Sequence, residues 1–500
     1  MVNRPQALPV RPGVVPRTVG LRIALLVILG AVSVGFPTWE YLRGGLNGDM
    51  WWVWRAGQWM VVHHQVLLRE PSLWTGPALA GRPWANPEWG WELILYLASP
   101  QGGILGFLVL LLACETLLLA AFWWTMHVIA PKLPIHRIAG LYALYAVAVA
   151  PIILRLRAEM GSYILFTLLL GVLWQSRTRP RRLWLLAPMT LVWANLHGSW
   201  LTVPALVGLE LVDSVLRRDK ERMILLLVAG WAVPLGIVVA LTPEHWYTLT
   251  YALWMSGNPQ ILAYIQEWGS VNFHVATFLA MGAAVLVGWM LRARRRIRYP
   301  WLLDVWMVGI TLFFFRETRM VAYFGIVFLL WCGYGLAQRG AARHARDEGP
   351  VAFRRWFGLA VATGVVTSIL VLPFGSALAA DHPSVPPAVV HWIDTHPHQG
   401  IFNPYRFGGY LLAHNVHDIF IDGRTDFYLK NSHRFQWYIK IAHGTVTPKQ
   451  MVHMFARNQI SWIVWPSSSW NAVLGWFVAT EHWHRIYTAH GWEIWAKPSN

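Results

Sequence analysis

The chain has 500 residues, of which 56% are hydrophobic and only 13% are charged, a composition that excludes an ordinary set of water-soluble domains. The formal net charge is +17. Twenty-four of the 41 Lys and Arg residues lie in the N-terminus and in alternate connections between apolar stretches, at residues 4–22, 127–137, 176–182, 217–222, 292–300 and 338–355. This alternation is the positive-inside bias of a multipass membrane protein, so it indicates contact with membrane lipids and argues against a nucleic-acid partner.

Eleven apolar stretches are predicted to cross the membrane, because about 20 helical residues span ~30 Å of hydrocarbon. They lie near residues 20–37, 103–127, 136–154, 159–175, 183–195, 199–216, 223–242, 273–291, 301–315, 320–337 and 356–375. The first is interpreted as an uncleaved span, since no small-residue cleavage site follows it. The basic connections place the N-terminus in the cytoplasm, and an odd number of spans places the C-terminus outside the plasma membrane.

We predict a polytopic α-helical membrane protein in two domains, a transmembrane domain at 1–375 with a long outer loop at 38–102, and a soluble extracytoplasmic α/β domain at 376–500. The expected elements of this tail follow from its local patterns. They are a helix capped by Thr447, a helix capped by Ser468 or Ser469, a strand at 460–465, a hairpin of 486–488 with 492–496, and a buried strand at 419–421 that ends at Asp422.

The first outer loop carries the most distinctive short segment, which reads Asp-Met-Trp-Trp-Val-Trp-Arg-Ala from Asp49 to Ala56. Asp49 is predicted to begin a helix in the membrane interface, where tryptophan is favoured because one edge of its ring is apolar and the other wet. The helix dipole stabilises an acid at this position. Asp49 is therefore either a capping residue or a catalytic carboxylate.

The Asp49–Ala56 segment is similar to the first-loop motif in the catalytic subunit of oligosaccharyltransferase. Further segments extend the resemblance over nearly the whole chain, namely Gly81–Trp84, Glu88-Trp89, Trp193–Gly198, Gln266–Trp268, Phe407–Tyr410 and Asp422–Asp426. With them the chain resembles bacterial multipass proteins assigned to the GT-C glycosyltransferase superfold. The resemblance implies a hexosyltransferase in which an acid of the first outer loop acts as the base, or as a metal ligand in oligosaccharyltransferase, and Asp49 matches that position.

The chain departs from oligosaccharyltransferase after the third span, where Arg155-Leu-Arg157-Ala-Glu159 stands in place of an acidic pair. The Trp-Trp-Asp motif of its tail is also missing from the sequence. Transfer to asparagine and dependence on a metal therefore do not follow from the resemblance. A divalent metal is compatible with the acids present, but the sequence offers no full ligand set, and we assign no metal ligand and no cofactor.

The implied reaction moves a sugar from a polyprenyl-phosphate donor to a glycan, lipid or protein acceptor. Phosphate leaves readily, so one base and a cationic clamp suffice, and arginine matches the geometry of phosphate. Arg316 and Arg319 interrupt an apolar stretch and are the first candidates for the clamp, although both can instead pair with Glu317 or lipid headgroups at the interface.

The second candidates for substrate binding are Arg55, Arg155, Arg157, Glu159 and His197. His197, between two short spans, is either a ligand for substrate or a structural histidine, and we predict no catalytic role for Glu267. The sequence contains no nucleotide-binding motif, which fits an activated lipid donor. The alternatives are a transporter or flippase of lipid-linked sugars and a non-enzymatic membrane scaffold.

Overall fold

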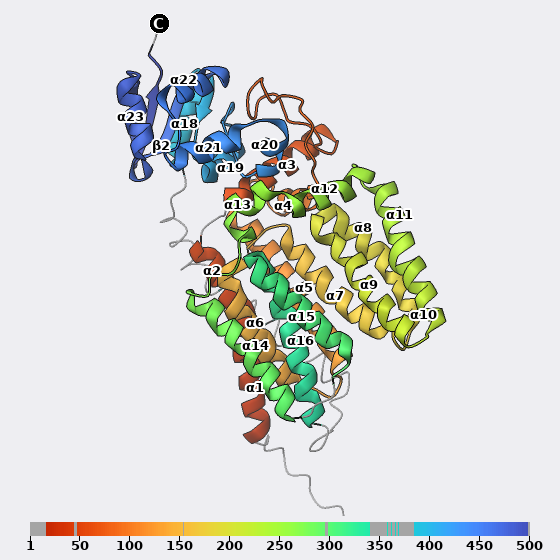
Figure 1. Cartoon of the computed structure of the whole chain (residues 1–500). Helices are drawn as coiled ribbons and strands as arrows, with labels where there is room; N and C mark the ends of the chain where they lie inside the picture. Colours follow the sequence, from red (N-terminus) through yellow and green to blue (C-terminus); the bar gives the residue numbers. More distant parts are fainter. Residues whose placement is uncertain are drawn as a thin grey trace, which may run out of the picture.

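The computed structural model describes residues 17–44, 48–153, 155–295, 299–340 and 385–498, together with four isolated helical positions between 358 and 369. A bundle of helices forms one end of the molecule, and the tail forms the other end (Figure 1). The bundle contains α1 (Arg17–Gly30), η1 (Ala31–Gly35), α2 (Phe36–Gly44), α5 (Ile104–Ile129), α6 (Ile135–Ile153), α7 (Glu159–Gln175), η2 (Pro180–Leu185), α8 (Leu186–Leu196), η3 (Gly198–Leu201), α9 (Thr202–Leu216), α10 (Lys220–Leu225), η4 (Leu226–Ala232), α11 (Val233–Leu241), α14 (Ala276–Arg295), α15 (Trp301–Arg316), η6 (Thr318–Met320) and α16 (Val321–Gly340).

Among the described residues, five helical segments are long and apolar enough to cross a membrane by length and composition. They are 104–129, 198–216, 220–241, 276–294 and 318–338. Ten of the eleven predicted spans coincide with helices of the bundle, whereas the eleventh, at 356–375, lies largely outside the described residues. The number of membrane crossings therefore stays a prediction.

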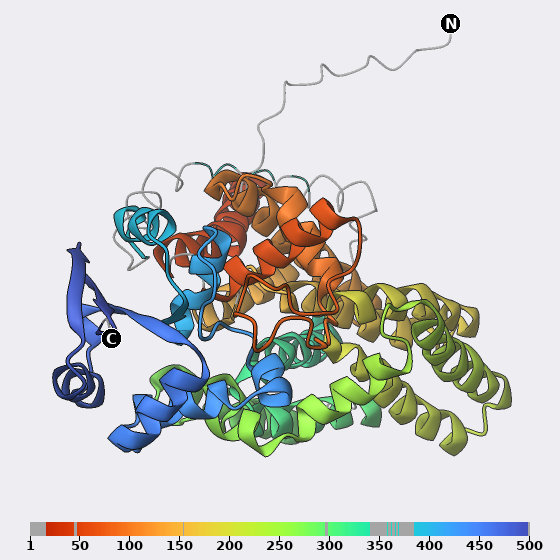
Figure 2. The same cartoon turned by 90° about the horizontal axis from the view of Figure 1, so that it is seen from above.

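The spans predicted at 183–195 and 301–315 end in turns at the tail side of the bundle. Helix α8 ends at Leu196 with the extended residue His197, and α15 ends at Arg316 with the extended residue Glu317. The basic helix α10, the end of α14 and the start of α15 lie at the opposite end of the bundle (Figure 1). Seen from above, helices α8 to α11 extend to one side of the bundle and the C-terminal sheet to the other (Figure 2).

Two outer loops lie between the bundle and the tail. The first outer loop contains α3 (Gly48–His63) and α4 (Trp89–Ala98), and the second contains α12 (Trp246–Gly257), α13 (Pro259–Tyr264) and η5 (Gln266–Trp268). The first loop shares a core with the tail, since Leu67, Trp74 and Trp84 pack in the same buried cluster as Phe420 and Tyr428. Burial of this apolar surface stabilises the docking of the tail on the loop.

The tail consists of α18 (Pro387–Thr395), β1 (Gly400–Phe402), α19 (Tyr405–Ala413), α20 (Thr425–Asn431), α21 (Arg434–Ala442), α22 (Pro448–Arg457), β2 (Ile460–Pro466), η7 (Ser467–Ser469), α23 (Ala472–Thr480), β3 (His484–Ala489) and β4 (Trp492–Ala496). The strands form one sheet in the order β1-β2-β4-β3, with β1 parallel to β2 and the other pairs antiparallel. The predicted strand β2, the β3–β4 hairpin and the Thr447 cap of α22, which forms a capping box with Gln450, are confirmed.

Two predictions for the tail are wrong. Residues 419–421 are buried but pair with β1 through a single parallel bridge, between Ile401 and Ile419, in which Phe420 N donates to Ile401 O at 2.8 Å. The Asn403 side chain also accepts from Phe420 N at 3.0 Å and donates to Ile421 O at 2.8 Å, so the backbone pairing does not continue past Phe420. Helix α23 is capped by Asn471, which accepts from Leu474 N at 2.8 Å, and not by Ser468 or Ser469, because those serines form the turn η7.

Candidate active site

A cavity of about 1210 Å³ lies where the bundle meets the tail. Its polar part is lined by side chains of the outer loops and of the turns that follow α8 and α15, including Asp49, Glu88, Arg157, Glu159, His197, Glu267, Arg316 and Arg319. Its apolar part descends between α7, α9 and α15, where it is lined by Phe166, Leu170, Leu206, Leu209, Val305, Trp306 and Ile310. The cavity therefore joins a charged chamber to an apolar channel inside the bundle.

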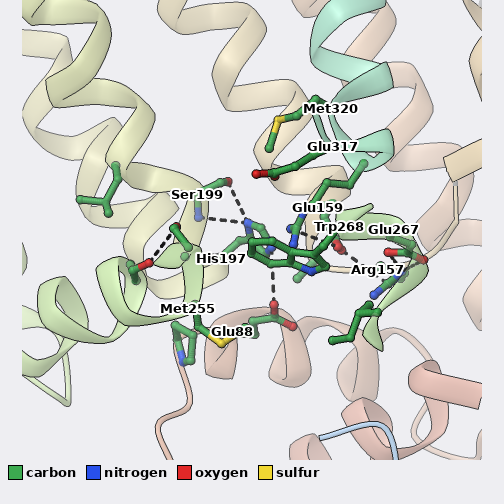
Figure 3. A pocket seen from close by; sticks show the side chains of 18 of the residues that line it. Glu88, Arg157, Glu159, His197, Ser199, Met255, Glu267, Trp268, Glu317 and Met320 are labelled. Atoms are coloured by element: carbon green, nitrogen blue, oxygen red, sulfur yellow. Dashed lines mark hydrogen bonds and ion pairs between the residues drawn. The ribbon is translucent and has the colours of Figure 1, made fainter. Parts of the chain in front are cut away.

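Arg157 is the centre of the charged chamber. Its Nη1 donates to both carboxylate oxygens of Glu267, at 2.9 and 3.0 Å. Its Nη2 lies 3.5 Å from Asp49 Oδ2, and its Nε lies 3.6 Å from Glu159 Oε2. Figure 3 shows Arg157 between Glu159 and Glu267, which come from different elements of the chain. We call these four residues the Arg157 cluster.

Asp49 is positioned by the tail as well as by its own helix. A Cβ added at Gly423 would lie 2.3 Å from Asp49 Oδ1, so only glycine fits at this contact. The turn that presents Gly423 is held by Arg424, whose guanidinium bonds to the carboxylates of Asp422 and Glu70 with no exposed side-chain surface on any of the three. The docked tail therefore fixes one wall around the Asp49 carboxylate.

His197 belongs to a second set of polar groups, beside the Arg157 cluster. Its Nδ1 accepts from Ser199 N at 3.2 Å, so the ring proton resides on Nε2, which faces Glu88 Oε1 at 3.6 Å. Ser199 Oγ in turn lies 2.9 Å from Ser162 Oγ. Figure 3 shows Glu88, His197 and Ser199 in a row on one side of the cavity.

The two arginines predicted to bind phosphate take different positions at the cavity. Arg319 stacks on the Trp268 ring at 4.2 Å and lies 3.9 Å from Glu159, with 18% of its side chain exposed. Arg316 lies 3.7 Å from Glu317 and keeps 61% of its side chain exposed. Arg316 therefore forms the predicted pair with Glu317 and still presents donors to the cavity.

Burial raises the pKa of two carboxyl groups in the site, whereas at Glu159 the charges of Arg157 and Arg319 outweigh burial and lower the pKa to about 2. Burial raises the pKa of Asp49, and the guanidinium of Arg157 offsets only part of that rise. Burial, reinforced by the charge of Glu159, raises the pKa of Glu88 well above its usual range. Burial lowers the pKa of His197 to about 4, so this ring is neutral at physiological pH. The site therefore combines poorly solvated carboxyls with a neutral imidazole.

The structure brings together most of the residues singled out from the sequence. Asp49, Arg157, Glu159, His197, Arg316 and Arg319 all line the cavity, as the shared side of their loops predicted. Arg55 and Arg155 are not among its described lining residues. Arg55 lies six residues after Asp49, about 120° around α3, and bonds to Gln58. Arg155 is exposed two residues before Arg157.

Three residues that contact the site were not assigned to it from the sequence. Glu88 follows a proline-rich stretch without a periodic pattern, and Glu267 was set aside as non-catalytic although it makes the shortest contacts with Arg157. Gly423 lies within the Asp422–Asp426 segment of the tail and has no side chain to suggest a role. The only sequence signal shared by the three is their position in segments that carry the GT-C resemblance.

The charged chamber does not fit a divalent metal ion. Among the residues that the structure describes, no group of three or more His, Cys, Asp and Glu side chains is placed to hold one. The carboxylates of Asp49, Glu159 and Glu267 instead converge on the guanidinium of Arg157.

No protein-family model and no curated protein sequence matches the chain. Solved structures do match. The oligosaccharyltransferase AglB from Archaeoglobus fulgidus, in complex with an inhibitory peptide and a dolichol-phosphate, is similar with a TM-score of 0.57 and 12% identity over 96% of this chain and 74% of that one. ArnT from Cupriavidus metallidurans in the apo state is similar with a TM-score of 0.51 and 14% identity over 96% of this chain and 98% of that one.

The chain has the fold of the GT-C glycosyltransferases. The resemblance predicted from the sequence is thereby confirmed at the level of the fold. Together with its apolar helices, this fold identifies a multipass helical membrane protein that carries a small C-terminal sheet.

Proposed function

We propose that this protein is a membrane glycosyltransferase that moves a sugar from a polyprenyl-phosphate donor to an extracytoplasmic acceptor. The observation that carries the proposal is the cavity, which connects a chamber of carboxylates and arginines to an apolar channel within a GT-C fold. A polyprenyl-phosphate sugar has the same two parts, a charged head and a long apolar chain.

The donor fits the cavity along α15. Val305 and Arg316 lie on this helix about 16 Å apart, since each residue adds ~1.5 Å of rise. The apolar channel between them accommodates several isoprene units, and the exposed guanidinium of Arg316 meets the phosphate at its upper end. Arg319 adds a second positive charge beside it. The phosphate leaves with the electron pair of its bond to the sugar, so no general acid is required.

The acceptor approaches the sugar from the side opposite to the phosphate, at Asp49. As an acceptor hydroxyl oxygen attacks the anomeric carbon, its proton passes to the Asp49 carboxylate. Poor solvation raises the proton affinity of Asp49 and so favours this transfer. Glu88 and His197 line the same chamber and supply hydrogen bonds to the acceptor.

The outer side of the plasma membrane is the proposed place of reaction. The arginine-rich connections lie at the end of the bundle opposite to the tail (Figure 1), and the positive-inside bias assigns that end to the cytoplasm. The dolichol-phosphate and the peptide bound by the archaeal oligosaccharyltransferase are a polyprenyl phosphate and a protein segment. They support a lipid-linked donor here and an acceptor that is a glycan, a lipid or a protein.

Asp49→Asn tests the proposal. The full-length protein in lipid vesicles is incubated with a panel of polyprenyl-phosphate hexoses, and the release of free polyprenyl phosphate is measured. We expect the variant to be slower by about 100-fold or more, because the base is lost. Asp394→Asn, at an exposed position of the tail, is the matched control and should be fully active. Equal rates for wild type and Asp49→Asn would remove Asp49 from the mechanism.

A further inference from the structure

The Arg157 cluster assembles three carboxylates that are far apart in the sequence. Asp49 comes from the first turn of α3, Glu159 from the start of α7 and Glu267 from η5. All three retain surface facing the cavity, with 31%, 17% and 38% of their side chains exposed. Carboxylates brought together from separate elements repel one another, so the arrangement requires a cation between them.

Arg157 is that cation. Its guanidinium carries five N–H donors in a rigid fork, and here its three nitrogens face the three carboxylates at 2.9 to 3.6 Å. A divalent ion would need carboxylate oxygens within about 2.0–2.6 Å of one point. The guanidinium fills the space in which such a point would lie.

We infer that Arg157 is a built-in cation that takes the place of an exchangeable divalent metal ion in this site. Arginine stays protonated at any physiological pH and is covalently part of the chain. Its positive charge therefore orients Asp49 toward the acceptor without any metal to be supplied or removed. This inference deepens the proposed glycosyl transfer and rests on it for the role of Asp49, but metal binding can be measured whether or not that reaction occurs.

The test is the binding of Mn²⁺ to the purified full-length protein, followed by the loss of the electron paramagnetic resonance signal of free Mn²⁺. Wild type should bind no Mn²⁺ in the cavity. Arg157→Ala removes the resident cation. The three carboxylates are not spaced to hold a metal as they stand, but without the guanidinium between them they can close around Mn²⁺, which prefers hard oxygen ligands. We expect the affinity for Mn²⁺ to rise by roughly tenfold or more in this variant.

Two further variants assign the binding to the cluster. Arg155→Ala removes an exposed arginine from the same turn and should gain no Mn²⁺ site. Adding Glu267→Gln to Arg157→Ala should weaken the acquired site again, because one ligand charge is lost. Wherever glycosyl transfer is detected, chelation with EDTA should leave the wild-type rate unchanged.

The inference is overturned if wild type binds Mn²⁺ in a manner that Asp49→Asn abolishes, and this measurement does not depend on the folding of any Arg157 variant. Failure of folded Arg157→Ala to gain Mn²⁺ affinity would also overturn it. If no sugar donor is ever consumed while the Mn²⁺ results are as expected, the proposed function fails and the built-in cation stands.

Discussion

Two arginines with acidic partners lie at opposite ends of the bundle, and they differ in exposure. Arg157, at the tail side, faces the cavity and keeps 27% of its side chain exposed. At the basic end, Arg222 bonds to Glu210 and Asp213 with 2% of its side chain exposed and none of theirs. Ser176 and Ser214 bond to the same guanidinium. We call this second set the Arg222 cluster.

The Arg222 cluster is a structural ion cluster, whereas the Arg157 cluster is a candidate reactive one. The guanidinium of Arg222 is enclosed, and its donors bond to the acids and serines of the cluster. The cluster is built mainly from the neighbouring elements α9 and α10. The Arg157 cluster borders a cavity large enough for a substrate, and it is completed by contacts with distant segments, including Gly423 of the tail. Both contain the same residue types, so residue type alone does not reveal which one reacts.

Loss of the buried arginine should have the largest effect. Arg222→Met removes the enclosed cation beside Glu210 and Asp213, and breaking a buried ion pair costs about 3–5 kcal/mol. Because Arg177 still pairs with Glu210 and Arg217 with Asp213, we expect a loss near the lower end of that range. Thermal unfolding in detergent, followed by size-exclusion chromatography, measures the loss. Arg179→Met, an exposed change in the same basic region, is the control and should unfold as wild type does. Equal stability of Arg222→Met and wild type would contradict a structural role for this cluster.

Glu92 is a buried acid that has no ion pair among the described residues. Its Oε2 accepts from Asn86 at 2.7 Å, and burial raises its pKa to about 8 from an unfolded value of 4.5. The folded protein therefore keeps a proton that the unfolded chain releases. The contribution of Glu92 to the free energy of unfolding is fully present below pH 4.5. As the pH rises from 4.5 toward 8, this contribution falls by at most about 1.4 kcal/mol per pH unit.

Glu92→Gln should remove this dependence, because the amide is neutral throughout. Between about pH 5 and pH 7 the variant is expected to lose roughly 2–3 kcal/mol less stability than wild type. Thermal unfolding at both values measures the difference, with Asp394→Asn as an exposed control. An unchanged pH slope in Glu92→Gln would show that Glu92 ionises in the folded protein as it does in water.

The contact between the tail and Asp49 should affect the reaction rate rather than the stability of the fold. In Gly423→Ala the added Cβ collides with the Asp49 carboxylate, and a displacement of about 1 Å can slow a reaction by roughly 100-fold, or about 2.7 kcal/mol. The rate of donor consumption measures it. Gly475→Ala, on α23 with no atom within 4 Å of the added Cβ, is the matched control. A fully active Gly423→Ala protein would show that the tail does not hold Asp49 in place.

The sequence was most informative where structure depends on neighbours along the chain. The capping box of α22 and the hairpin of β3 and β4 arise from local residues, and both were predicted correctly. The strand expected at 419–421 is reduced to one bridge with β1, because a side chain distant in sequence, Asn403, bonds to the next backbone group, Ile421 O. Arg55 is a candidate for substrate binding from the sequence, but it lies about 120° around α3 from Asp49 and is not among the residues that line the cavity.

The sequence by itself determined the apolar helices and the position of the basic connections between them, because hydrophobic length and local charge act without knowledge of tertiary contacts. It also indicated which turns share a side with Asp49. Only the tertiary structure decided that Arg157 gathers three carboxylates while Arg222 is enclosed, and that Gly423 contacts Asp49. The partners of a charged side chain are set by which elements pack together, and that packing depends on buried surfaces contributed by segments hundreds of residues apart.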